Sequence, residues 1–491
     1  MARKEEIEKE RLLKLEKLRK LKINPYPDKF DKKNSALELQ EKYKKLGKDK
    51  SKKDKVKIAG RILVVRDIGK IIFATMQDFS GKIQIMLQKD KTSSKTINFF
   101  KKFVDSGDFV GVSGTIYRTK TGELSIVVKK LELLSKAILP LPEKWHGLQD
   151  EEERYRKRYL ELIMNPELKE IFIKKQKFWK AIRDFLTERG FVEVETPVLE
   201  NTTGGADAKP FITHHNALGI DVYLRISMGE LWQKRLMISG FEKTFEIGRQ
   251  FRNEGISAEH LQDYSQMEFY LAYANYEQGM KIVEELYKYI ARETLGSLRF
   301  KSKGFDIDLG KKWKKIDYIS EIKKQTKIDF FKVSREDIEK KLKELKIEFE
   351  PNLEKERLID LLWKYCRKNI KGPAFVINHP VEVSPLAKRN MKDKRKVDRF
   401  IVVIAGSELG NGYSELNDPL DQENRFLRQQ ELKEKGDEEA QMYDKEFVEA
   451  LKYGMPPVCG FGLSERLFAF LVDKPVRECQ LFPLLRPEEK R

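Results

Sequence analysis

The sequence has few cysteines and no long apolar run. Three of its 491 residues, Cys366, Cys459 and Cys479, are cysteines far apart in the chain, so neither a C-x-x-C zinc site nor a disulfide framework is indicated. We expect buried, reduced thiols. No apolar run reaches the roughly 18 residues needed to span a bilayer, and the basic N-terminus lacks an apolar signal-peptide core. These absences predict a cytoplasmic protein with no membrane partner.

Several common catalytic signatures are also missing. The chain has no G-x-x-x-x-G-K-[ST] phosphate loop, no G-x-S-x-G nucleophile turn and no H-E-x-x-H zinc helix. His214 and His215 lie in ITHHNAL, which is typical of a strand end and a turn. We therefore expect a structural role for this histidine pair rather than metal binding.

The charge balance is strongly positive. Lys and Arg number 98 against 79 Asp and Glu, which gives a net charge of +19 and a pI near 9.4. Such a balance favours a polyanionic partner, most commonly a nucleic acid, although a generally lysine-rich composition would produce the same charge. The length of 491 residues predicts two or three domains.

The first segment, residues 1–55, is expected to be a basic helical arm followed by a linker. Leucine spacing predicts an amphipathic helix over 3–22, and a second short helix is expected over 35–46. The run KDKSKKDK is interpreted as a solvated linker. The arm is either a contact surface for an RNA backbone or a solvated helix, and the pattern favours neither.

Residues 56–140 show a different pattern of short alternating runs. VKIAGRILVVRD, KIIFATMQD, GKIQIMLQ, DFVGVSGTIYRT and LSIVVKKLELL are separated by Ser-Gly or Thr-Gly turn signals, with a helical segment at 95–104. Four or five strands and one helix predict a small OB-fold β-barrel.

The rest of the chain is expected to form a larger domain. Residues 141–165 are interpreted as a linker and lead helix, and residues 166–491 as an α+β domain on an antiparallel sheet. Strands are expected at 222–226, 243–252 and 264–274, with a helix at 276–295. A Lys- and Glu-rich stretch at about 300–372 is predicted to be a helical insertion.

Two arginines stand out as candidate anion-binding groups. FRNEG ends an alternating strand on which Glu246, Gly248, Gln250 and Arg252 share one face. Arg252 offers a planar, permanently charged fork for phosphate or carboxylate, although a buried structural Arg–Glu pair is the alternative. In GFGLSER, two glycines permit close approach of a ligand or backbone, and Arg466 follows.

Acidic residues lie among apolar strand residues in the segments GEL, QMEFY and AGSELGNGYSEL. Carboxylates in such surroundings are costly unless they are paired, either with a cationic substrate, with a metal, or with lysines of the chain. Nearby tyrosines add aromatic walls suited to an ammonium group. The acids and tyrosines concerned are Glu230, Glu268, Glu408, Glu415, Tyr270 and Tyr413.

Taken together, these residues resemble a class II lysyl-tRNA synthetase along nearly the whole chain. HGLQDEEERYRKRYLELIMNPE resembles the family's linker and lead helix, and GFVEVETPVL resembles motif 1, the dimer-interface element ending at Pro197. FRNEG with MEFYLAYA resembles motif 2, and GFGLSERL resembles motif 3. HPVEVSPLAK and ELGNGYSELNDPLDQ are especially characteristic of the lysine enzyme.

The resemblance implies an OB-fold anticodon-binding domain joined to a catalytic domain on a six- or seven-stranded antiparallel sheet. It implies a homodimer that forms lysyl-adenylate from L-lysine and ATP with Mg²⁺ and then charges tRNA(Lys). The implied catalytic residues are Arg252 and Arg466. The implied ATP contacts are Arg252, Glu254, His260, Tyr264, Glu408 and Arg466. The implied L-lysine contacts are Gly205, Glu230, Arg252, Glu268, Tyr270, Asn411, Tyr413 and Glu415.

Finer roles follow from the same resemblance. Arg252 would bridge the α-phosphate and the lysine carboxylate, while Tyr264 and Arg466 would sandwich the adenine. The implied magnesium ligands are Glu408 and Glu415, and the implied anticodon readers are Phe73 and Gln84. Core packing is the alternative role for Phe73.

The chain departs from the family pattern in four places. GFGLSER is one residue shorter than usual before Arg466, and RISMGEL is one residue longer before Glu230. Ile401 stands where relatives often have a metal-binding glutamate, which leaves the number of Mg²⁺ ions open. Glu259 replaces a usual arginine, which weakens the expected contacts with ATP phosphates.

Three other functions are compatible with part of this pattern. An aspartyl- or asparaginyl-tRNA synthetase shares the barrel and the three motifs, but acids at Glu268 and Glu415 disfavour an acidic substrate. A lysyltransferase that modifies a translation factor resembles the catalytic domain alone, whereas the barrel pattern is intact here. A non-enzymatic RNA-binding relative would not need the arginines of motifs 2 and 3.

Overall fold

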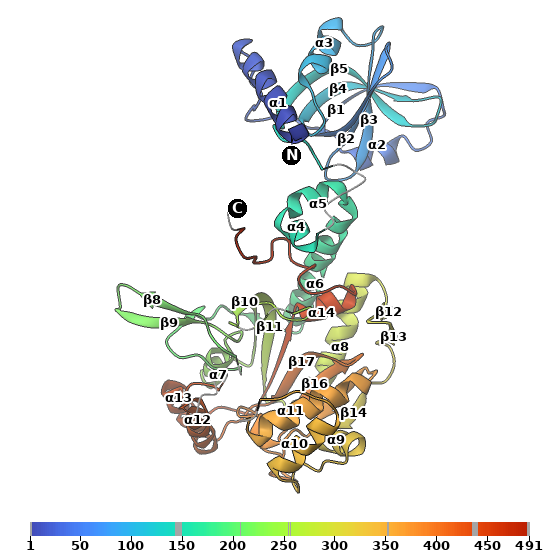
Figure 1. Cartoon of the computed structure of the whole chain (residues 1–491). Helices are drawn as coiled ribbons and strands as arrows, with labels where there is room; N and C mark the ends of the chain where they lie inside the picture. The colour runs from blue at the N-terminus through green and yellow to red at the C-terminus, as the bar shows by residue number, and fades with distance from the viewer. Residues whose placement is uncertain are drawn as a thin grey trace. The chain divides into compact units, whose positions relative to one another are not determined.

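A computed structural model describes residues 2–142, 150–206, 208–253, 255, 257–350, 353–434 and 440–488. The chain divides into two compact units, Met1–Pro166 and Glu167–Arg491 (Figure 1). Among the described residues, no helix is both long and apolar enough to cross a membrane.

The N-terminal unit is built on a closed five-segment barrel with strand order β1-β2-β3-β5-β4, which confirms the OB-fold prediction. Ile62, Ile85 and Val112 are fully buried and represent the alternating inward positions that form its core. The barrel strands are β1 Lys50–Asp67, β2 Ile71–Gln77, β3 Lys82–Gln88, β4 Phe109–Arg118 and β5 Leu124–Ser135. The helices of the unit are α1 Ala2–Lys20, α2 Ala36–Lys42, α3 Ser94–Phe103, α4 Glu151–Arg156 and α5 Arg158–Met164.

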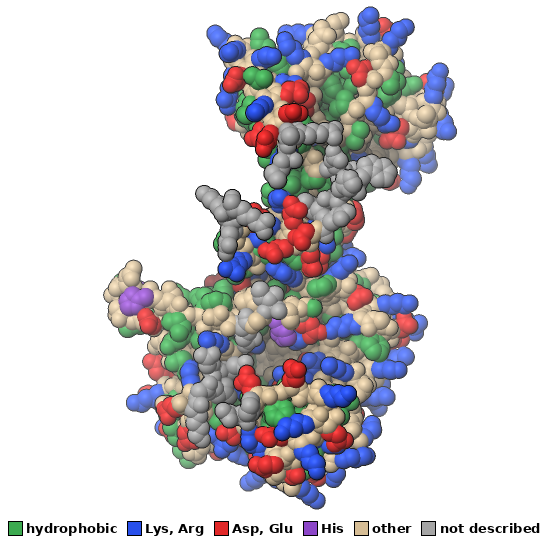
Figure 2. Space-filling model, in the orientation of Figure 1, with side chains coloured by type: hydrophobic (Ala, Val, Ile, Leu, Met, Phe, Trp, Pro, Cys, Tyr) green, Lys and Arg blue, Asp and Glu red, His purple; other side chains and the backbone are tan. Residues whose placement is uncertain are grey.

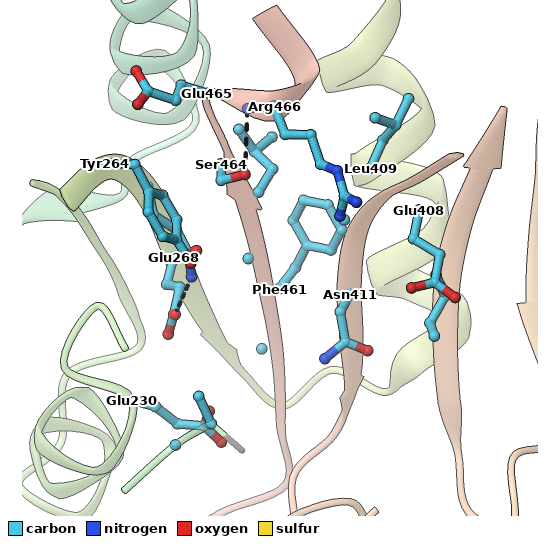
Figure 3. Close-up of a pocket in the computed structure, with 18 of the residues that line it drawn as sticks. Glu230, Tyr264, Glu268, Glu408, Leu409, Asn411, Phe461, Ser464, Glu465 and Arg466 are labelled. Atoms are coloured by element: carbon cyan, nitrogen blue, oxygen red, sulfur yellow. Dashed lines mark hydrogen bonds between the residues drawn. The ribbon is translucent and has the colours of Figure 1, made fainter. Parts of the chain in front are cut away.

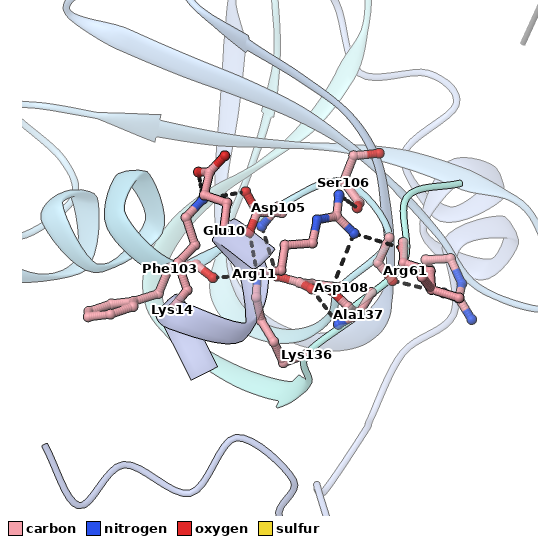
Figure 4. A network of polar contacts seen from close by, with 12 residues as sticks. Glu10, Arg11, Lys14, Arg61, Phe103, Asp105, Ser106, Asp108, Lys136 and Ala137 are labelled. Carbon is pink, nitrogen blue, oxygen red and sulfur yellow. Dashed lines mark hydrogen bonds and ion pairs between the residues drawn. The ribbon is translucent and has the colours of Figure 1, made fainter. Parts of the chain in front are cut away.

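Helix α1 is docked on the barrel rather than solvated. Leu18 is fully buried in the barrel core, and the Arg11 guanidinium donates to the backbone carbonyls of Ser106 and Leu139 at 2.9 and 2.8 Å (Figure 4). Lys14 adds an ion pair with Asp105 at 2.8 Å. Helix α1 is therefore not solvated on all sides, because one face contacts apolar and polar partners about a hundred residues away in the chain. Its exposed face leaves the alternative of an RNA-backbone contact as a prediction.

The expected linker at the end of the arm is also shorter than predicted. Strand β1 starts at Lys50, inside the KDKSKKDK run, and Lys50 pairs with Arg118 of β4. Residues 50–55 are exposed, so their lysines remain solvated while the backbone joins the ladder. The lysine-rich composition of this run correctly indicated solvent exposure. It gave no sign of the strand, because the backbone pairs with β4, which is distant in the sequence.

The larger unit is built around one sheet with strand order β14-β15-β16-β17-β18-β11-β10-β6. The strands from β15 to β10 pair antiparallel, whereas β14 and β6 add parallel edges. This confirms the α+β prediction with an antiparallel sheet. The strands are β6 Val192–Glu193, β10 Lys243–Phe251, β11 Asp263–Ala272, β14 Lys314–Asp317, β15 Ala374–Ile377, β16 Arg399–Ile404, β17 Ser407–Ser414 and β18 Val458–Ser464.

Helices cover the two faces of this sheet differently. Phe245, Met267 and Phe461 point to one face and pack with α6 Lys169–Glu188 and α8 Tyr276–Leu295 in an apolar core. On the other face, α7 Glu230–Ile238, α12 Pro419–Glu434 and α13 Lys445–Lys452 pack around Tyr270 and leave a hollow beside them. Helix α14 Arg466–Leu471 follows β18 directly. A small sheet with order β7-β9-β8 contains β7 Leu199–Glu200, β8 Ile212–His215 and β9 Ile220–Leu224.

The expected helical insertion at 300–372 is only partly helical. Its first part forms the hairpin β12 Arg299–Ser302 and β13 Phe305–Asp308, followed by β14 of the main sheet. Helices α9 Tyr318–Thr326, α10 Arg335–Glu344 and α11 Lys355–Cys366 then enclose a core of their own. The Lys-rich composition favoured a helix, and the two-residue turn Lys303–Gly304 between two short alternating runs was therefore overlooked.

Cys366, Cys459 and Cys479 are buried and unpaired, as expected. Burial raises the pKa of the Cys366 and Cys479 thiols to about 12, and it raises the pKa of the Cys459 thiol as well. These thiols are therefore core residues rather than nucleophiles.

Candidate active site

A cavity of about 380 Å³ opens on the sheet face opposite α6 and α8. Its floor consists of side chains that alternate with core residues along β11, β17 and β18. On β11, for example, Glu268 faces the cavity while its neighbours Met267 and Phe269 are fully buried in the apolar core. Because side chains along a strand alternate between its two faces, one strand supplies both the polar residues of the cavity and the apolar residues of the core.

Two glycines of β18 make room for the cavity's side chains. Gly460 and Gly462 flank the core residue Phe461 and face the cavity. A Cβ at position 460 would lie 2.1 Å from Glu415 Oε1, and one at position 462 would lie 3.0 Å from Glu268 Cγ. The two glycines of the G-F-G pattern therefore leave space for two carboxylates, one of which, Glu268, is seen in Figure 3 beside β18.

One end of the cavity is acidic and buried. Glu230 begins α7, Glu268 lies on β11 and Glu415 follows β17, with 4%, 6% and 1% of their surfaces exposed. Lys234, one turn after Glu230 on α7, places its Nζ 2.6 Å from Glu230 Oε1 and 2.5 Å from Glu415 Oε2. One fully buried ammonium therefore lies between two of three buried carboxylates.

This arrangement shifts the protonation equilibria of the acidic end. Burial raises the pKa of the Glu268 and Glu415 carboxyls, and the Glu230 charge raises both further. Burial alone would lower the pKa of Lys234, but Glu230 and Glu415 together raise it above its usual value. Lys234 therefore stays charged. The raised pKa values of Glu268 and Glu415 show that one ammonium does not compensate three buried carboxylates, and a further cation bound beside them would favour their ionised forms.

Two tyrosines complete the acidic end. Tyr270 Oη donates to Glu268 Oε2 at 3.0 Å, and Tyr413 Oη donates to Glu230 Oε1. Burial and the neighbouring carboxylates raise the pKa of both phenols well above the usual value, so both remain donors. The ring of Tyr413 also lies 5.5 Å from Lys234 Nζ, which shows that this wall accepts an ammonium group.

The middle of the cavity carries groups suited to a carboxylate or phosphate. Arg252 follows β10, where its Nε donates to the backbone carbonyl of Ile226 at 3.3 Å. Asn411 Oδ1 accepts from Arg399 Nε at 2.8 Å, an arrangement that turns the amide Nδ2 donor of Asn411 toward the cavity (Figure 3). Gly205 lines the same wall with φ +86°, and a Cβ there would lie 2.8 Å from the Cβ of Glu230.

The mouth of the cavity is cationic and partly exposed. Arg466 enters from the start of α14, with Tyr264 across β18 from it (Figure 3). Glu259, from the loop between β10 and β11, forms ion pairs with Arg466 and with Lys303 of the β12–β13 turn. His260 follows Glu259, and partial desolvation and the Arg466 charge lower its pKa. Position 254, expected to contact ATP, lies outside the described residues.

The two expected magnesium ligands differ in their surroundings. Glu408 lies near the start of β17, Glu415 directly follows its end, and both line the cavity. Glu408 Oε1 accepts from Trp363 Nε1 at 2.6 Å, and its side chain is 31% exposed at the cavity wall. Glu415 is instead paired with Lys234.

The surroundings of Glu408 and Glu415 bear on how each could bind a magnesium ion. Within the described residues no group of three or more His, Cys, Asp or Glu could hold a metal. Mg²⁺ commonly takes one or two protein carboxylates and completes its shell with substrate phosphates and water. Glu408 fits that requirement with a partly exposed carboxylate, and Glu415, which lines the same cavity but is paired with Lys234, stays a predicted ligand.

Most other residues expected in one site do line the same cavity. They are Gly205, Glu230, Arg252, His260, Tyr264, Glu268, Tyr270, Asn411, Tyr413 and Arg466. The sequence interpretation missed Lys234, although its spacing of four from Glu230 was the available signal for a helical ion pair. It also missed Gln266, whose amide donates to Glu268 Oε1 at 2.6 Å.

The other expected pair, Phe73 and Gln84, lies on the barrel of the N-terminal unit. Thr75 pairs with Gln84 across β2 and β3, so Phe73 and Gln84 are diagonal neighbours on one face. Phe73 is half-buried, and its neighbours Ile72 and Ala74, not Phe73, belong to the barrel core. Gln84 Oε1 accepts from Ser125 Oγ at 2.8 Å, which leaves its amide hydrogens as donors.

Comparison with known proteins agrees with this geometry. The family model for class II tRNA synthetases (D, K and N) matches residues 150–486, and that for the OB-fold nucleic acid binding domain matches residues 56–134. The chain belongs to the class II tRNA synthetases. A lysine–tRNA ligase of Thermotoga maritima is 45% identical over 99% of this chain and 97% of its own length. One from Carboxydothermus hydrogenoformans is 45% identical over 99% of both chains.

As a class II tRNA synthetase, the chain has a defined arrangement of its motifs. The motif 2 strands β10 and β11 pair in continuous register from Lys243–Leu271 to Phe251–Asp263. The motif 3 strand β18 then pairs with β11, with Gly462 opposite Glu268. Motifs 2 and 3 are therefore adjacent strands of one sheet, which explains why residues two hundred positions apart line one cavity.

Proposed function

We propose that this class II tRNA synthetase is a lysine–tRNA ligase, which activates L-lysine with ATP and then transfers lysine to the 3′ end of tRNA(Lys). The observation that carries the proposal is the buried acidic end of the cavity. Three carboxylates, Glu230, Glu268 and Glu415, surround a single internal cation, Lys234. When all three carboxylates are ionised, this end has an excess of two negative charges, which matches the two ammonium groups of a diamino acid.

The same geometry supports selectivity against other amino acids. In the proposed complex the α-ammonium contacts Glu230 and the Gly205 carbonyl, and the ε-ammonium contacts Glu268, Tyr270 and Glu415. A substrate without the distal ammonium would leave buried carboxylates unpaired. Discrimination of that kind reaches about 10⁴-fold, because the cost of the unpaired groups falls on the wrong substrate. Aspartate would bring a further negative charge to this end.

Adenylate formation then needs positioning and charge neutralisation rather than a protein base. One oxygen of the lysine carboxylate attacks the α-phosphorus, and the bond from that phosphorus to the bridging oxygen breaks, so that pyrophosphate leaves. Arg252, with the Asn411 amide, would hold the carboxylate against the α-phosphate. Tyr264 and Arg466 would hold the adenine, and Arg466 would also reach the γ-phosphate.

Magnesium would be held at the mouth by Glu408 together with the ATP phosphates. When bound, the ion supplies positive charge that neutralises the developing charge on the pyrophosphate. In the second step a terminal ribose hydroxyl of tRNA attacks the lysyl carbonyl carbon, and AMP leaves. On the barrel, Phe73 would stack on an anticodon base and Gln84 would donate to its edge.

We also infer that the protein forms a homodimer. We infer further that it is located in the cytoplasm, the compartment in which tRNA is charged. Support for the homodimer comes from exposed apolar side chains on or directly beside the short strands β6 to β9. Part of this region is the motif 1 segment GFVEVETPVL. The side chains exposed by 42–63% are Val192, Val198, Leu199, Ile212 and Ile220. Exposed apolar groups of this kind commonly mark an interface, and a two-fold axis would pair like with like. A monomeric mass in light scattering at micromolar concentration would contradict this inference.

The deciding experiment is ATP–pyrophosphate exchange measured with each amino acid in turn. We expect exchange with L-lysine, weak exchange with ornithine, and background exchange with aspartate and asparagine. Exchange that depends on aspartate or asparagine would assign the chain to the other branches of its family. A matched Glu268→Gln variant should lose most lysine-dependent exchange while it still binds ATP.

A further inference from the structure

An acidic side chain occupies the cationic mouth of the cavity. Glu259 Oε1 pairs with Lys303 Nζ, and Glu259 Oε2 pairs with the Arg466 guanidinium. Lys303 Nζ also donates to Ser407 Oγ at 2.8 Å, beside the wall residue Glu408. One carboxylate thus bridges two cations from separate elements at the place where the proposed function requires negatively charged phosphates.

The two cations are held by a common framework. Arg466 begins α14, and the same helix anchors the β12–β13 hairpin, because Ser302 Oγ donates to the Phe470 carbonyl at 2.7 Å. Just beyond α14, Asp473 Oδ1 accepts from the backbone N–H of Lys303 at 2.9 Å. The hairpin turn therefore cannot move away from Arg466 without breaking contacts, one of which is fully buried.

Lys303 carries a long side chain at a backbone position that favours glycine. Lys303 has φ +49°, a left-handed conformation that glycine adopts freely and that costs an L-residue about 1 kcal/mol. The next residue, Gly304, also has positive φ, +77°. A lysine in the strained position of this turn directs a long cationic side chain toward the mouth, which a glycine could not do.

Glu259, in contrast, is attached to its partners by partly exposed contacts. It lies in the loop between β10 and β11, and the side chains of Glu259, Arg466 and Lys303 are 26%, 21% and 42% exposed. Ion pairs with this exposure contribute about 1 kcal/mol or less, because water competes for both charges. A triphosphate, with several negative charges and more acceptor oxygens, can replace one carboxylate between the two cations.

We propose that Glu259 is a displaceable internal counter-ion of the phosphate subsite, and that Lys303 is a further phosphate-binding residue which Glu259 releases when a triphosphate or pyrophosphate enters. The proposal rests on the proposed function, since it assumes that ATP binds in this cavity. In the nucleotide-free enzyme Glu259 keeps both cations oriented. After pyrophosphate leaves, the same carboxylate competes with its return and so favours release.

The test is nucleotide binding by titration calorimetry in the presence of Mg²⁺ and without amino acid. The probes are α,β-methylene-ATP, which keeps the terminal phosphates but cannot be cleaved at the α–β bond, and AMP, which lacks those phosphates. The proteins are the full-length chain and its variants Glu259→Gln, Lys303→Met and the double variant. Lys301→Met is the matched control, because Lys301 lies on the same hairpin and its side chain is 82% exposed.

We expect Glu259→Gln to bind α,β-methylene-ATP about five-fold more tightly, because a competing ion pair is removed. We expect Lys303→Met to bind it about ten-fold more weakly, because a charge-assisted contact is lost. Lys303→Met should weaken binding to a similar extent in the Glu259→Gln background. AMP affinity should stay the same in every variant, and Lys301→Met should match the wild type.

Three outcomes would overturn the proposal. Unchanged or weaker binding by Glu259→Gln would show that Glu259 does not compete with phosphate. Loss of the Lys303→Met effect in the Glu259→Gln background would show that Lys303 acts only through Glu259. Equal changes for AMP and the triphosphate would place the effect elsewhere. If these occur while the wild type still exchanges pyrophosphate with lysine, the proposed function stands; a wild type that binds neither nucleotide would refute both.

Discussion

The two ends of the cavity use ion pairs in opposite ways. At the inner end, Lys234 and its partners Glu230 and Glu415 have between 0% and 4% of their surfaces exposed. At the mouth, Glu259 and its partners Arg466 and Lys303 have side chains between 21% and 42% exposed. The inner pairs are part of the fold, because breaking one leaves an uncompensated buried charge at a cost of about 3–5 kcal/mol. The outer pairs are weak enough for a ligand to exchange them.

This difference assigns different tasks to similar chemical groups. A rigid inner end can select an amino acid by charge number, because its carboxylates cannot turn away to find water. A displaceable mouth can admit and release highly charged phosphates without holding the product. Arg252, between the two ends, would contact both substrates at once. The following predictions test that division, from the largest expected effect to the smallest.

Replacement of Arg252 by alanine should reduce lysine-dependent ATP–pyrophosphate exchange by about a thousand-fold or more, because a fixed guanidinium at the reacting groups is lost. Urea unfolding should change little, since Arg252 is only half-buried and its Nε contact with the Ile226 carbonyl is 3.3 Å long. Exchange near the wild-type rate would show that Arg252 takes no part in the reaction. It would also contradict the proposed division of tasks between the two ends of the cavity.

Replacement of Glu268 by glutamine should raise the KM for lysine about a hundred-fold, because a buried charge-assisted contact with the ε-ammonium is lost. The KM for ATP should stay within two-fold, since Glu268 lies at the inner end. Glu259→Gln provides the opposite pattern, with an effect on ATP alone. If both variants change both constants together, the two ends are not independent.

Glu200 is a buried acid without a lysine partner, so it shows how much such an acid lowers the free energy of unfolding when it is ionised. Its Oε1 accepts from Trp232 Nε1 at 2.9 Å, while Oε2 has no hydrogen-bond partner among the described residues. Burial raises the pKa of Glu200 to about 7 from 4.5. Because the folded pKa lies above the unfolded one, Glu200 should cost the wild type about 3 kcal/mol of stability as the pH rises from about 4.5 to above 7.

Glu200→Gln should remove the Glu200 share of this loss, so the difference between its unfolding free energies in urea at pH 5 and pH 8 should be smaller than that of the wild type by about 3 kcal/mol. The raised pKa values of Glu268 and Glu415 should leave a pH dependence common to both proteins. The matched control is Glu246→Gln. Glu246 lies 2.5 Å from Arg225 in a buried pair, so that variant should be destabilised at pH 8. A Glu200→Gln variant with the pH dependence of the wild type would show that another group titrates.

Replacement of Phe73 by alanine should reduce tRNA charging about ten-fold through a higher KM for tRNA, because one base–aromatic stack is lost. Pyrophosphate exchange without tRNA should be unchanged, since Phe73 belongs to the barrel. A minihelix that carries only the acceptor stem should be charged equally by both proteins. Equal charging of full-length tRNA would remove Phe73 from the anticodon surface.

Much of the fold could be predicted from periodicity and turn signals. The helix expected at 276–295 is α8, Tyr276–Leu295, and the strands expected at 243–252 and 264–274 are β10 and β11 within two residues at each end. The errors arose where partners are distant. The helix α1 depends on Arg11 contacts near residue 139, and β1 begins at Lys50 because β4 supplies its ladder. Local patterns carry no information on such partners.

The candidate site could be predicted residue by residue but not in its internal pairing. Arg252, Glu268 and Arg466 were expected in one cavity, and they line it. The pairing of Glu415 with Lys234 was not expected, and the assignment of Glu415 to magnesium stays a prediction. The residues on either side of Lys234 in α7 do not distinguish it from a surface lysine. Only the tertiary structure shows that it is buried.

By itself, the sequence determined the family, the order of the motifs and the kinds of groups in the cavity, since these depend on residue identity and spacing. The tertiary structure alone decided which charges are neutralised within the chain. Glu230, Lys234 and Glu415 form one buried cluster, and Glu259, Lys303 and Arg466 form one exposed cluster. The physical reason is that the strength of an ion pair depends on its burial and on partners far away in the chain, and neither is a local property of the sequence.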